Sequence, residues 1–475
     1  MKFIVVGGGT AGCISALMLK TKYKHSDVTI IESKNVGIVG VGESSTEHWG
    51  DFCNFVGINQ MSAITRANAT FKVGVYFDQW TDEDFMHCVG VGPALGEDSL
   101  HDKYYHNAAY VIANSKPNHW MQTPMTWQNK ISTRSLVDKH TSPTPQFQFD
   151  THALNVMLHD ACEQLGINVI TDDLVDIEYQ DANISSVVSE HTKYDADFFI
   201  DCSGFRRFLS QDTLWKSYSE YLPLNSAISF ATNEMVEYNK YTKCTARSSG
   251  WSWQIPTQTR TGNGYVFCDE FINSQDAMKE MNLYHFDKQF KFDPGRLEKA
   301  WVNNCFAVGL SQSFVEPLEA TSIGSAIQSM FCFLHHFPSY DRDGCNQEIN
   351  HMFDNIAEYV QAHYLTQRED TPFWKYIKHD LKLLPGLEET LNKWKNRMPL
   401  NGDIQKKWGL FDVQNYIPIL YGLKWFDTGV IKKEFELHGY YHDDYQRRFE
   451  DDYAIQKELI WISHKHAIRL INTSD

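Results

Sequence analysis

The amino terminus carries the most restrictive pattern in the chain, an apolar run followed by a glycine turn. The segment KFIVVGGGTAGCISALMLK (residues 2–20) predicts a buried strand, a tight turn and then an amphipathic helix. The pattern Gly-x-Gly-x-x-Gly falls on Gly7, Gly9 and Gly12. Glycines at these positions permit the turn and let the backbone approach a pyrophosphate at the helix N-terminus. The pattern therefore predicts an α/β fold that binds a dinucleotide.

The sequence that follows agrees with this prediction. The segment DVTIIES (residues 27–33) predicts a second strand that ends at Glu32. An acidic residue about 20 positions beyond the glycines suits the hydroxyl pair of a ribose. A second glycine-rich loop occupies residues 39–45, and an apolar strand within residues 194–209 is expected to return to the nucleotide-binding sheet. We expect the insertion between them, residues 50–190, to belong to another lobe.

Length and composition set the broad class. A chain of 475 residues is expected to hold two lobes, or one large α/β domain with additions. The predicted division is a nucleotide-binding domain with inserted β/α segments over residues 1–340, and a mainly helical lobe over residues 341–475 that covers the substrate site. A net charge of −17 argues against a nucleic acid or an anionic membrane as a partner.

The ten cysteines are scattered and form no C-x-x-C pair. We interpret them as reduced thiols of a cytoplasmic protein, with neither a disulfide framework nor a metal site. No run of 18 apolar residues occurs, so no membrane span is expected.

The segment GWSWQIP (residues 250–256) places two tryptophans one residue apart. In an extended segment Trp251 and Trp253 point to the same side and form one aromatic wall. Pro256 is expected to end the strand, because it has no N–H to donate. From these residues alone, an ordinary well-packed strand is the simpler interpretation.

Four blocks, in order along the chain, resemble the flavin-dependent tryptophan halogenase family. The segment 250–256 carries W-x-W-x-I-P, and ATFKVGVYFDQW (residues 69–80) is similar to the lysine block of the family. WVNNCFAVGLSQSFVEPLEATSIGSAIQSM (residues 301–330) resembles its glutamate and halide block. EYVQAHYLTQREDTPFWKYI (residues 358–377) resembles a fourth block, which we expect to hold the helical lobe on the rest of the protein without a part in catalysis.

The resemblance implies a monooxygenase-type FAD domain and the cofactor FADH2, used with dioxygen and a halide ion (chloride, bromide or iodide). It also implies a separate flavin reductase and a small aromatic substrate, and it leaves a homo-oligomer open. The motif and the resemblance together predict these cofactor-binding residues: Gly7, Gly8, Gly9, Thr10, Ala11, Gly12, Glu32, Ser33, Glu43, Ser44, Val175, Leu310 and Ile323.

The resemblance also assigns the reacting groups. Lys72 and Glu319 take the catalytic positions, and the backbone at Thr321 and Ser322 contacts the halide. Hypohalous acid made by the enzyme is delivered to Lys72, and Glu319 stabilises the charged ring or removes its proton. Taken alone, Lys72 is more simply a solvated surface charge, and Glu319 a carboxylate that compensates a helix dipole.

The resemblance also assigns a barrier between flavin and substrate, formed by Trp251, Trp253, Ile255 and Pro256.

The chain departs from the family pattern in two places, the halide block and the residues that follow the lysine block. Ala320 replaces a serine and Ser322 replaces a glycine, so chloride preference is not assumed. His87, Cys88 and Val89 stand where members that act on free tryptophan carry His-Pro-Phe, and the stacking phenylalanine is missing. We therefore expect an electron-rich aromatic acceptor, indole- or phenol-like, other than free tryptophan.

Two other functions remain open from the sequence. One is an FAD-dependent monooxygenase that hydroxylates an aromatic substrate. The other is a catalytically idle flavin-binding relative of the halogenases.

Overall fold

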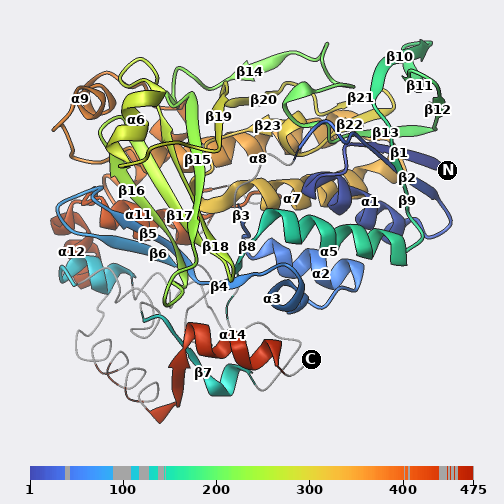
Figure 1. Cartoon of the computed structure of the whole chain (residues 1–475). Coiled ribbons are helices and arrows are strands. Elements are labelled where there is room, and N and C mark those ends of the chain that lie inside the picture. Colours follow the sequence, from blue (N-terminus) through green and yellow to red (C-terminus); the bar gives the residue numbers. More distant parts are fainter. Residues whose placement is uncertain are drawn as a thin grey trace.

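The computed structural model describes residues 1–37, 43–88, 108–116, 128–136, 144, 146–400, 402–404, 407–437, 447, 450, 454 and 458–473. Two large sheets lie on opposite sides of the molecule, with long helices running between and behind them (Figure 1). The six-stranded sheet carries the amino terminus, and the seven-stranded sheet forms the other side.

The six-stranded sheet is mostly parallel. Its order is β21 (Trp301–Val302), β22 (Cys305–Ala307), β13 (Phe198–Asp201), β1 (Lys2–Val6), β2 (Asp27–Glu32) and β9 (Asn168–Thr171). All pairs are parallel except that of β21 with β22. The strands β1 and β13 are almost wholly buried, because helices cover one face of the sheet and side chains of β10 (Leu174–Gln180) and β11 (Asn183–Ser189) pack on the other.

Three helices pack beside this sheet. Helix α1 (Thr10–Lys22) contacts both α5 (Thr151–Gln164) and α7 (Thr321–His336). The Asp150 side chain caps α5 by accepting hydrogen bonds from two backbone N–H groups.

The prediction that residues 50–190 belong to another lobe is wrong for their last part. Strand β9 pairs with β2, and α5 packs on α1, so both belong to the nucleotide-binding sheet. The physical reason is the crossover rule: a helix that packs on a parallel sheet returns the chain to an adjacent strand of the same sheet.

The seven-stranded sheet is antiparallel apart from one pair. Its order is β19 (Lys288–Lys291), β15 (Ser226–Asn233), β18 (Arg260–Phe267), β17 (Gly250–Pro256), β16 (Tyr241–Arg247), β5 (Gly74–Asp78) and β6 (Phe85–Cys88). Only β16 and β5 run parallel. A small sheet of β3 (Glu43–Ser44), β8 (Gln146–Phe149) and β4 (Thr70–Lys72) lies at its lower end in Figure 1.

The described residues after position 341 are mainly helical. They form α8 (Arg342–Ala362), α9 (Pro372–His379), α10 (Pro385–Trp394), α11 (Val413–Gly422), α12 (Thr428–Leu437) and α14 (His464–Asn472). Before α14, the strand β24 (Trp461–Ser463) pairs with β7 (Lys130–Ser132). One cluster of buried side chains extends from Phe3 to Ile468, so these helices share a continuous core with the sheets.

The structure contains further helices, strands and turns. They are α2 (His48–Val56), α3 (Ser62–Arg66), α6 (Ser274–Glu280), β10 (Leu174–Gln180), β11 (Asn183–Ser189), β12 (Lys193–Asp195), β14 (Trp215–Ser217), β20 (Gly295–Leu297) and β23 (Ser313–Phe314), with 3₁₀ turns at Thr133–Leu136, Gly204–Arg206, Gly309–Ser311, Leu318–Ala320 and Phe337–Ser339.

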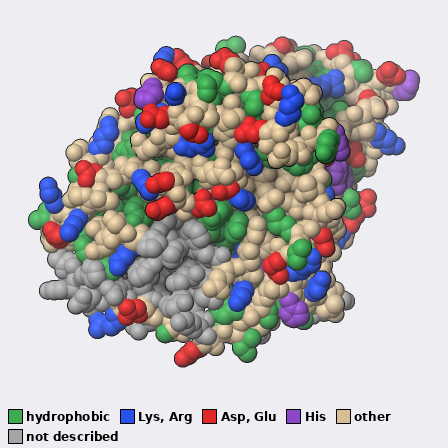
Figure 2. Space-filling view, turned by 60° about the vertical axis from the view of Figure 1, so that its left-hand side comes forward, with side chains coloured by type: hydrophobic (Ala, Val, Ile, Leu, Met, Phe, Trp, Pro, Cys, Tyr) green, Lys and Arg blue, Asp and Glu red, His purple; other side chains and the backbone are tan. Residues whose placement is uncertain are grey.

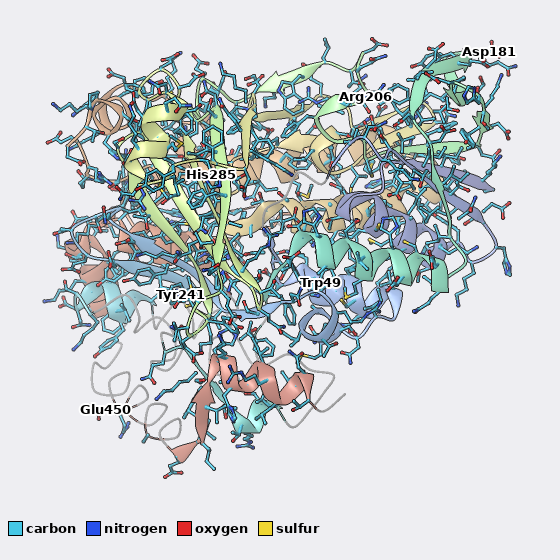
Figure 3. All side chains as sticks on the ribbon, viewed as in Figure 1. Trp49, Asp181, Arg206, Tyr241, His285 and Glu450 are labelled. Carbon is cyan, nitrogen blue, oxygen red and sulfur yellow. The ribbon has the colours of Figure 1, made fainter. Side chains whose placement is uncertain are left out.

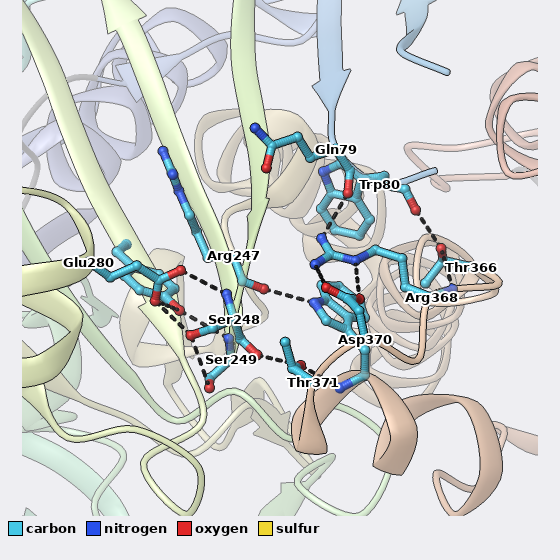
Figure 4. A network of polar contacts seen from close by, with 12 residues as sticks. Gln79, Trp80, Arg247, Ser248, Ser249, Glu280, Thr366, Arg368, Asp370 and Thr371 are labelled. Atoms are coloured by element: carbon cyan, nitrogen blue, oxygen red, sulfur yellow. Dashed lines mark hydrogen bonds and ion pairs between the residues drawn. The ribbon is translucent and has the colours of Figure 1, made fainter. Parts of the chain in front are cut away.

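The segment between α8 and α9 ties the helices to the seven-stranded sheet (Figure 4). Arg368 forms a two-pronged ion pair with Asp370 and donates to the carbonyl oxygen of Gln79 at 2.8 Å. The Trp374 indole donates to the carbonyl oxygen of Arg247 at 2.7 Å. These contacts agree with the holding role predicted for this block.

On the face in Figure 2, acidic and basic side chains are interspersed, and the acidic excess of the chain forms no single patch there. Among the described helices, none combines the length and the hydropathy that a membrane span requires.

Candidate active site

A cavity of about 410 Å³ joins the two sheets, and it is the frame of the candidate site. Residues at the carboxyl ends of β1, β2 and β13 line one part of it, and residues of β16 and β17 line another. Arg206, which lines the cavity, lies at the top of Figure 3, whereas Tyr241, the neighbour of the lining residue Thr242, lies near the lower end of the seven-stranded sheet. Ligands of open α/β sheets bind at such strand ends.

The glycine turn after β1 shows why side chains are excluded there. Gly7 has φ +110°, and an added Cβ would lie 2.2 Å from the carbonyl oxygen of Cys202. A Cβ on Gly12 would lie 1.8 Å from the carbonyl oxygen of Gly7. At Gly9, which precedes α1, a Cβ would meet nothing within 4 Å. Helix and strand thus pack closely while the helix N-terminus is left open, and this arrangement fits a pyrophosphate.

Glu32 lies at the end of β2 and lines the same part of the cavity. His159 Nε2 donates to the carbonyl oxygen of Gly8 at 2.9 Å and lies 3.4 Å from the Glu32 carboxylate. The Glu32 side chain is 30% exposed and can therefore accept hydrogen bonds from a ribose. The hydrogen-bonding groups at this end of the cavity fit a dinucleotide.

Most other predicted cofactor residues also reach the cavity. Gly7, Gly8, Gly9, Thr10, Ala11, Glu32, Ser33, Glu43, Ser44, Leu310 and Ile323 line it. Within the described residues the Oε2 atom of Glu43 is buried without a hydrogen-bond partner, and burial raises its pKa to about 7. An orphaned polar atom of this kind fits a ligand group that donates to it.

Two predicted cofactor residues do not line the cavity. Gly12 lies inside α1, where it serves the close packing described above. Val175 is 54% exposed, while its neighbour Leu174 lines the cavity. The exposed Val175 side chain is not part of the cavity lining, and the role of Val175 in cofactor binding stays a prediction.

Lys72 ends β4 and is only 1% exposed, so the surface-charge interpretation is wrong. Its Nζ donates to the carbonyl oxygen of Ser45 at 3.5 Å, and the side chain lines the cavity. Burial lowers the pKa of Lys72 to about 8, although the nearby Glu319 carboxylate raises it. About one molecule in ten then carries a neutral amine at pH 7.

Glu319 stands on a strained turn directly before α7. Glu319 and Ala320 have φ values of 67° and 60°, in the left-handed region that side chains disfavour by about 1–2 kcal/mol per residue. The turn directs the Glu319 side chain into the cavity, where it is 5% exposed. It therefore does not act as a solvated carboxylate that compensates the helix dipole.

Two histidines contact the same oxygen of Glu319. His87 Nδ1 lies 2.8 Å and His363 Nε2 lies 3.4 Å from Oε1. Burial on its own would raise the pKa of Glu319, but His87 and His363 outweigh burial and lower it. Glu319 is thus held as a carboxylate in a buried site.

Sequence reasoning missed both histidines. His363 was given a holding role with the rest of residues 358–377, and His87 only marked a departure from a family block. Along the sequence His87 lies 232 residues and His363 lies 44 residues from Glu319, and neither spacing forms a recognisable motif. Val89, the third residue of that block, lies outside the described residues.

The first turn of α7 also lines the cavity, through Thr321 and Ser322. The preceding residue, Ala320, offers no side chain to cap the helix. Backbone N–H groups at a helix start without a side-chain cap favour an anion.

The tryptophan pair forms the wall expected of an extended segment. Trp251 and Trp253 both line the cavity, with ring centroids 6.2 Å apart. The Trp251 indole donates to Glu316 at 3.2 Å. The Trp253 ring lies against Gly264, where a Cβ would come within 2.0 Å of it. Ile255 also lines the cavity, whereas Pro256 ends β17 outside it.

A second polar cluster lies away from the cavity, on α7 and α8. Side-chain atoms of Cys332, His336 and Glu348 lie within 4.8 Å of one another, a spacing that metal ligands share. Lys407 and Trp408 already donate to the Glu348 carboxylate. Because an ammonium group neutralises this carboxylate, we assign no metal to the cluster.

Comparisons with known proteins agree with the geometry. The family model described as tryptophan halogenase matches residues 2–431. Tryptophan 7-halogenase RebH of Lentzea aerocolonigenes is 29% identical over 478 residues, which cover 89% of this chain and 89% of that protein. The structure of tryptophan 6-halogenase SttH of Streptomyces toxytricini has a TM-score of 0.82 at 27% identity, covering 98% of this chain and 99% of that one.

A tryptophan halogenase from Shewanella frigidimarina NCIMB 400 shares the fold, with a TM-score of 0.86 at 23% identity over 100% of this chain and 98% of that chain. The family match extends over most of the chain, and the cavity carries the groups such an enzyme needs. The chain therefore belongs to the tryptophan halogenase family and is a flavin-dependent halogenase.

Proposed function

We propose that the chain halogenates an electron-rich aromatic substrate between Lys72 and Glu319, using hypohalous acid that reaches Lys72. The observation that carries this proposal is that one cavity contains both side chains, the tryptophan wall and the glycine turn. Lys72 and Glu319 are 1% and 5% exposed, and burying two ionisable groups costs free energy that a purely structural role does not require.

The glycine turn, Glu32, Ser33, Glu43, Ser44, Leu310 and Ile323 hold FAD in this proposal. FADH2 and dioxygen supply the oxidising equivalent that converts a halide ion into hypohalous acid. The N–H groups of Thr321 and Ser322 hold the halide near the flavin, and Trp251 and Trp253 keep the aromatic substrate away from it. A separate flavin reductase provides FADH2.

Lys72 captures or orients the hypohalous acid. A neutral amine has a lone pair that can accept the halogen as a haloamine, and an ammonium group can donate a hydrogen bond to its oxygen. In either form the electrophile is held at one point of the cavity. Glu319 faces the ring as it becomes positively charged, stabilises that charge and accepts the ring proton.

The substrate side of the site includes side chains of α8. Phe353 and Ile356 line the cavity, and His363 follows the same helix. We assign the helices from α8 onward to the lobe that covers the substrate. Val89 stands where the family carries its stacking phenylalanine, so the acceptor is an indole- or phenol-like compound other than free tryptophan. Ser322 leaves bromide or iodide open alongside chloride.

The test supplies the purified protein with FAD, a flavin reductase, NADH, air and equal amounts of chloride, bromide and iodide. Indoles, phenols and anilines are offered as acceptors, and products are measured by mass spectrometry. We expect halogenated products that disappear in Lys72→Ala. A hydroxylated product in place of a halogenated one would favour the monooxygenase alternative.

Lys240 offers a matched control. It is 4% exposed, and burial lowers its pKa to about 8, but it does not line the cavity. Lys240→Ala should therefore keep its halogenation activity per folded molecule. If Lys72→Ala and Lys240→Ala halogenate equally well, the role of Lys72 is refuted.

A further inference from the structure

Two histidines from distant elements meet at Glu319, and their hydrogen bonds define where protons lie. His87 belongs to β6, His363 directly follows α8, and both are fully buried. We propose that His363 receives, through Glu319, the proton that the aromatic ring loses, and that His87 is locked as a neutral donor that positions Glu319. This inference rests on the proposed function.

The tautomer of His87 is set by Asn415 in the first turn of α11. The backbone N–H of Asp412 donates to Asn415 Oδ1 at 2.8 Å, which fixes the orientation of the amide. The Nδ2 group of Asn415 then faces His87 Nε2 at 3.3 Å. Because an amide NH2 group only donates, Nε2 accepts and carries no hydrogen.

The remaining ring hydrogen of His87 is therefore on Nδ1, which donates to Glu319 Oε1 at 2.8 Å. Tyr359 agrees with this assignment. Its hydroxyl donates to the carbonyl oxygen of Asn415 at 3.5 Å, and its oxygen accepts from His87 Nδ1 at 3.1 Å. His87 thus orients Glu319 as a neutral donor and adds no positive charge.

The ring hydrogen of His363 points away from Glu319, whereas that of His87 points towards it. Its Nδ1–H donates to the carbonyl oxygen of Tyr359 at 2.8 Å, because a carbonyl oxygen only accepts. The nitrogen that faces Glu319 Oε1 at 3.4 Å is Nε2, the one that can gain a proton. A proton that reaches Glu319 Oε1 therefore has His363 Nε2 as an adjacent acceptor.

Atoms and electrons balance in this step. The ring carbon forms a bond to the halogen, whose bond to the oxygen of hypohalous acid or to the nitrogen of Lys72 breaks. The C–H bond of the ring then breaks, its electron pair restores the aromatic ring, and the proton passes to a Glu319 oxygen and on to His363 Nε2. The electron pair of the broken halogen bond stays on oxygen or nitrogen, so that proton finally converts the released hydroxide into water or the deprotonated Lys72 nitrogen into a neutral amine.

Several other titratable groups surround Glu319. The titratable groups that interact with Glu319 are His87, Lys72, Cys88 and Cys244, from β6, β4 and β16, and Tyr359 of α8 lies beside both histidines. Burial raises the pKa of both thiols well above the usual range. They remain protonated below neutral pH, as Lys72 does with its pKa near 8.

The main test uses His363→Gln, which keeps a polar side chain beside Glu319 but cannot accept a proton. We expect kcat for halogenation to fall about 100-fold, the low end for a lost proton acceptor, with KM for the acceptor little changed. A substrate deuterated at the halogenated carbon should react more slowly than the protiated one only in the variant, because ring deprotonation becomes rate-limiting. Hypohalous acid formed without acceptor, measured by a trapping thiol, should match the wild type.

His336→Gln is the matched control. His336 contacts Glu348 at 2.9 Å, a buried histidine–glutamate pair outside the cavity. The control should show no isotope effect. An isotope effect that is equal in His363→Gln and wild type would overturn the proposal, since a merely structural role does not change it.

One measurement keeps the proposal testable if His363→Gln does not fold. Nitrogen NMR of the purified full-length protein with labelled histidine should show His87 neutral and protonated on Nδ1. A His87 protonated on Nε2 contradicts the proposal, whereas a wild type that never halogenates refutes the proposed function and leaves this NMR result standing.

Discussion

The two ends of the cavity are built in different ways. At the end proposed for the dinucleotide, consecutive residues of one turn line the cavity, and they do so mainly through backbone groups. At the reaction end, Lys72, His87, Glu319 and His363 come from four separate parts of the chain and act through side chains. A local sequence pattern can specify the first end, whereas only the packing of both sheets and α8 assembles the second.

Glu319→Gln should cause a large loss of halogenation that affects only the reaction end. Gln keeps the size and still accepts from His87, but it neither stabilises a positive ring nor takes up its proton. We expect halogenation to fall about 1,000-fold. FAD affinity, measured by flavin fluorescence, should stay close to the wild-type value. A variant that loses FAD binding and activity together would mean that the two ends are not separable.

Substitutions in the glycine turn should do the reverse. A Cβ added at Gly12 would lie 1.8 Å from the carbonyl oxygen of Gly7, so Gly12→Ala should destabilise the fold by about 1–3 kcal/mol and weaken FAD binding.

Gly9→Ala separates the two effects. Its Cβ meets no protein atom within 4 Å, so thermal stability without FAD should be unchanged while FAD affinity falls. Scanning calorimetry with and without FAD measures both quantities. Equal losses of stability in the two variants would refute the assignment of Gly9 to the cofactor.

Lys72→Met should stabilise the cofactor-free protein while it removes activity. The folded pKa of Lys72 is about 8 against 10.5 in the unfolded chain, so its charged form disfavours folding below pH 8. Removing it should raise the free energy of unfolding by about 2–3 kcal/mol at pH 7. The gain should shrink as pH rises from 8 towards 10.5, since the wild type becomes more stable there. Urea unfolding at several pH values checks this, and a gain independent of pH would contradict it.

Gly264→Ala should have the smallest effect, on the boundary between the two ends. A Cβ there would come within 2.0 Å of the Trp253 ring and displace it, while Trp251 keeps its bond to Glu316. We expect a few-fold loss of halogenation and an increase in hydrogen peroxide released per NADH used. Unchanged coupling would show that Trp253 does not act as a barrier.

The sequence by itself determined much of the dinucleotide end. The strand, turn and helix at residues 2–22, the acidic end of β2 and the cap of α5 follow from local rules of periodicity, glycine geometry and capping. Resemblance to a family placed Lys72 and Glu319, but the residues alone left Lys72 on a surface and Glu319 at a helix dipole. For Val175 the cofactor-binding role stays a prediction, because its exposed side chain does not line the cavity.

Tertiary structure decided the rest. Whether Lys72 is buried depends on β4 meeting β8 and β16, and the partners of Glu319 depend on β6 and α8 meeting behind α7. Such contacts join residues up to 232 positions apart, and no periodicity or spacing encodes them. The charge state of a buried group is set by all its neighbours at once, so the chemistry of this site emerges only when the chain is packed.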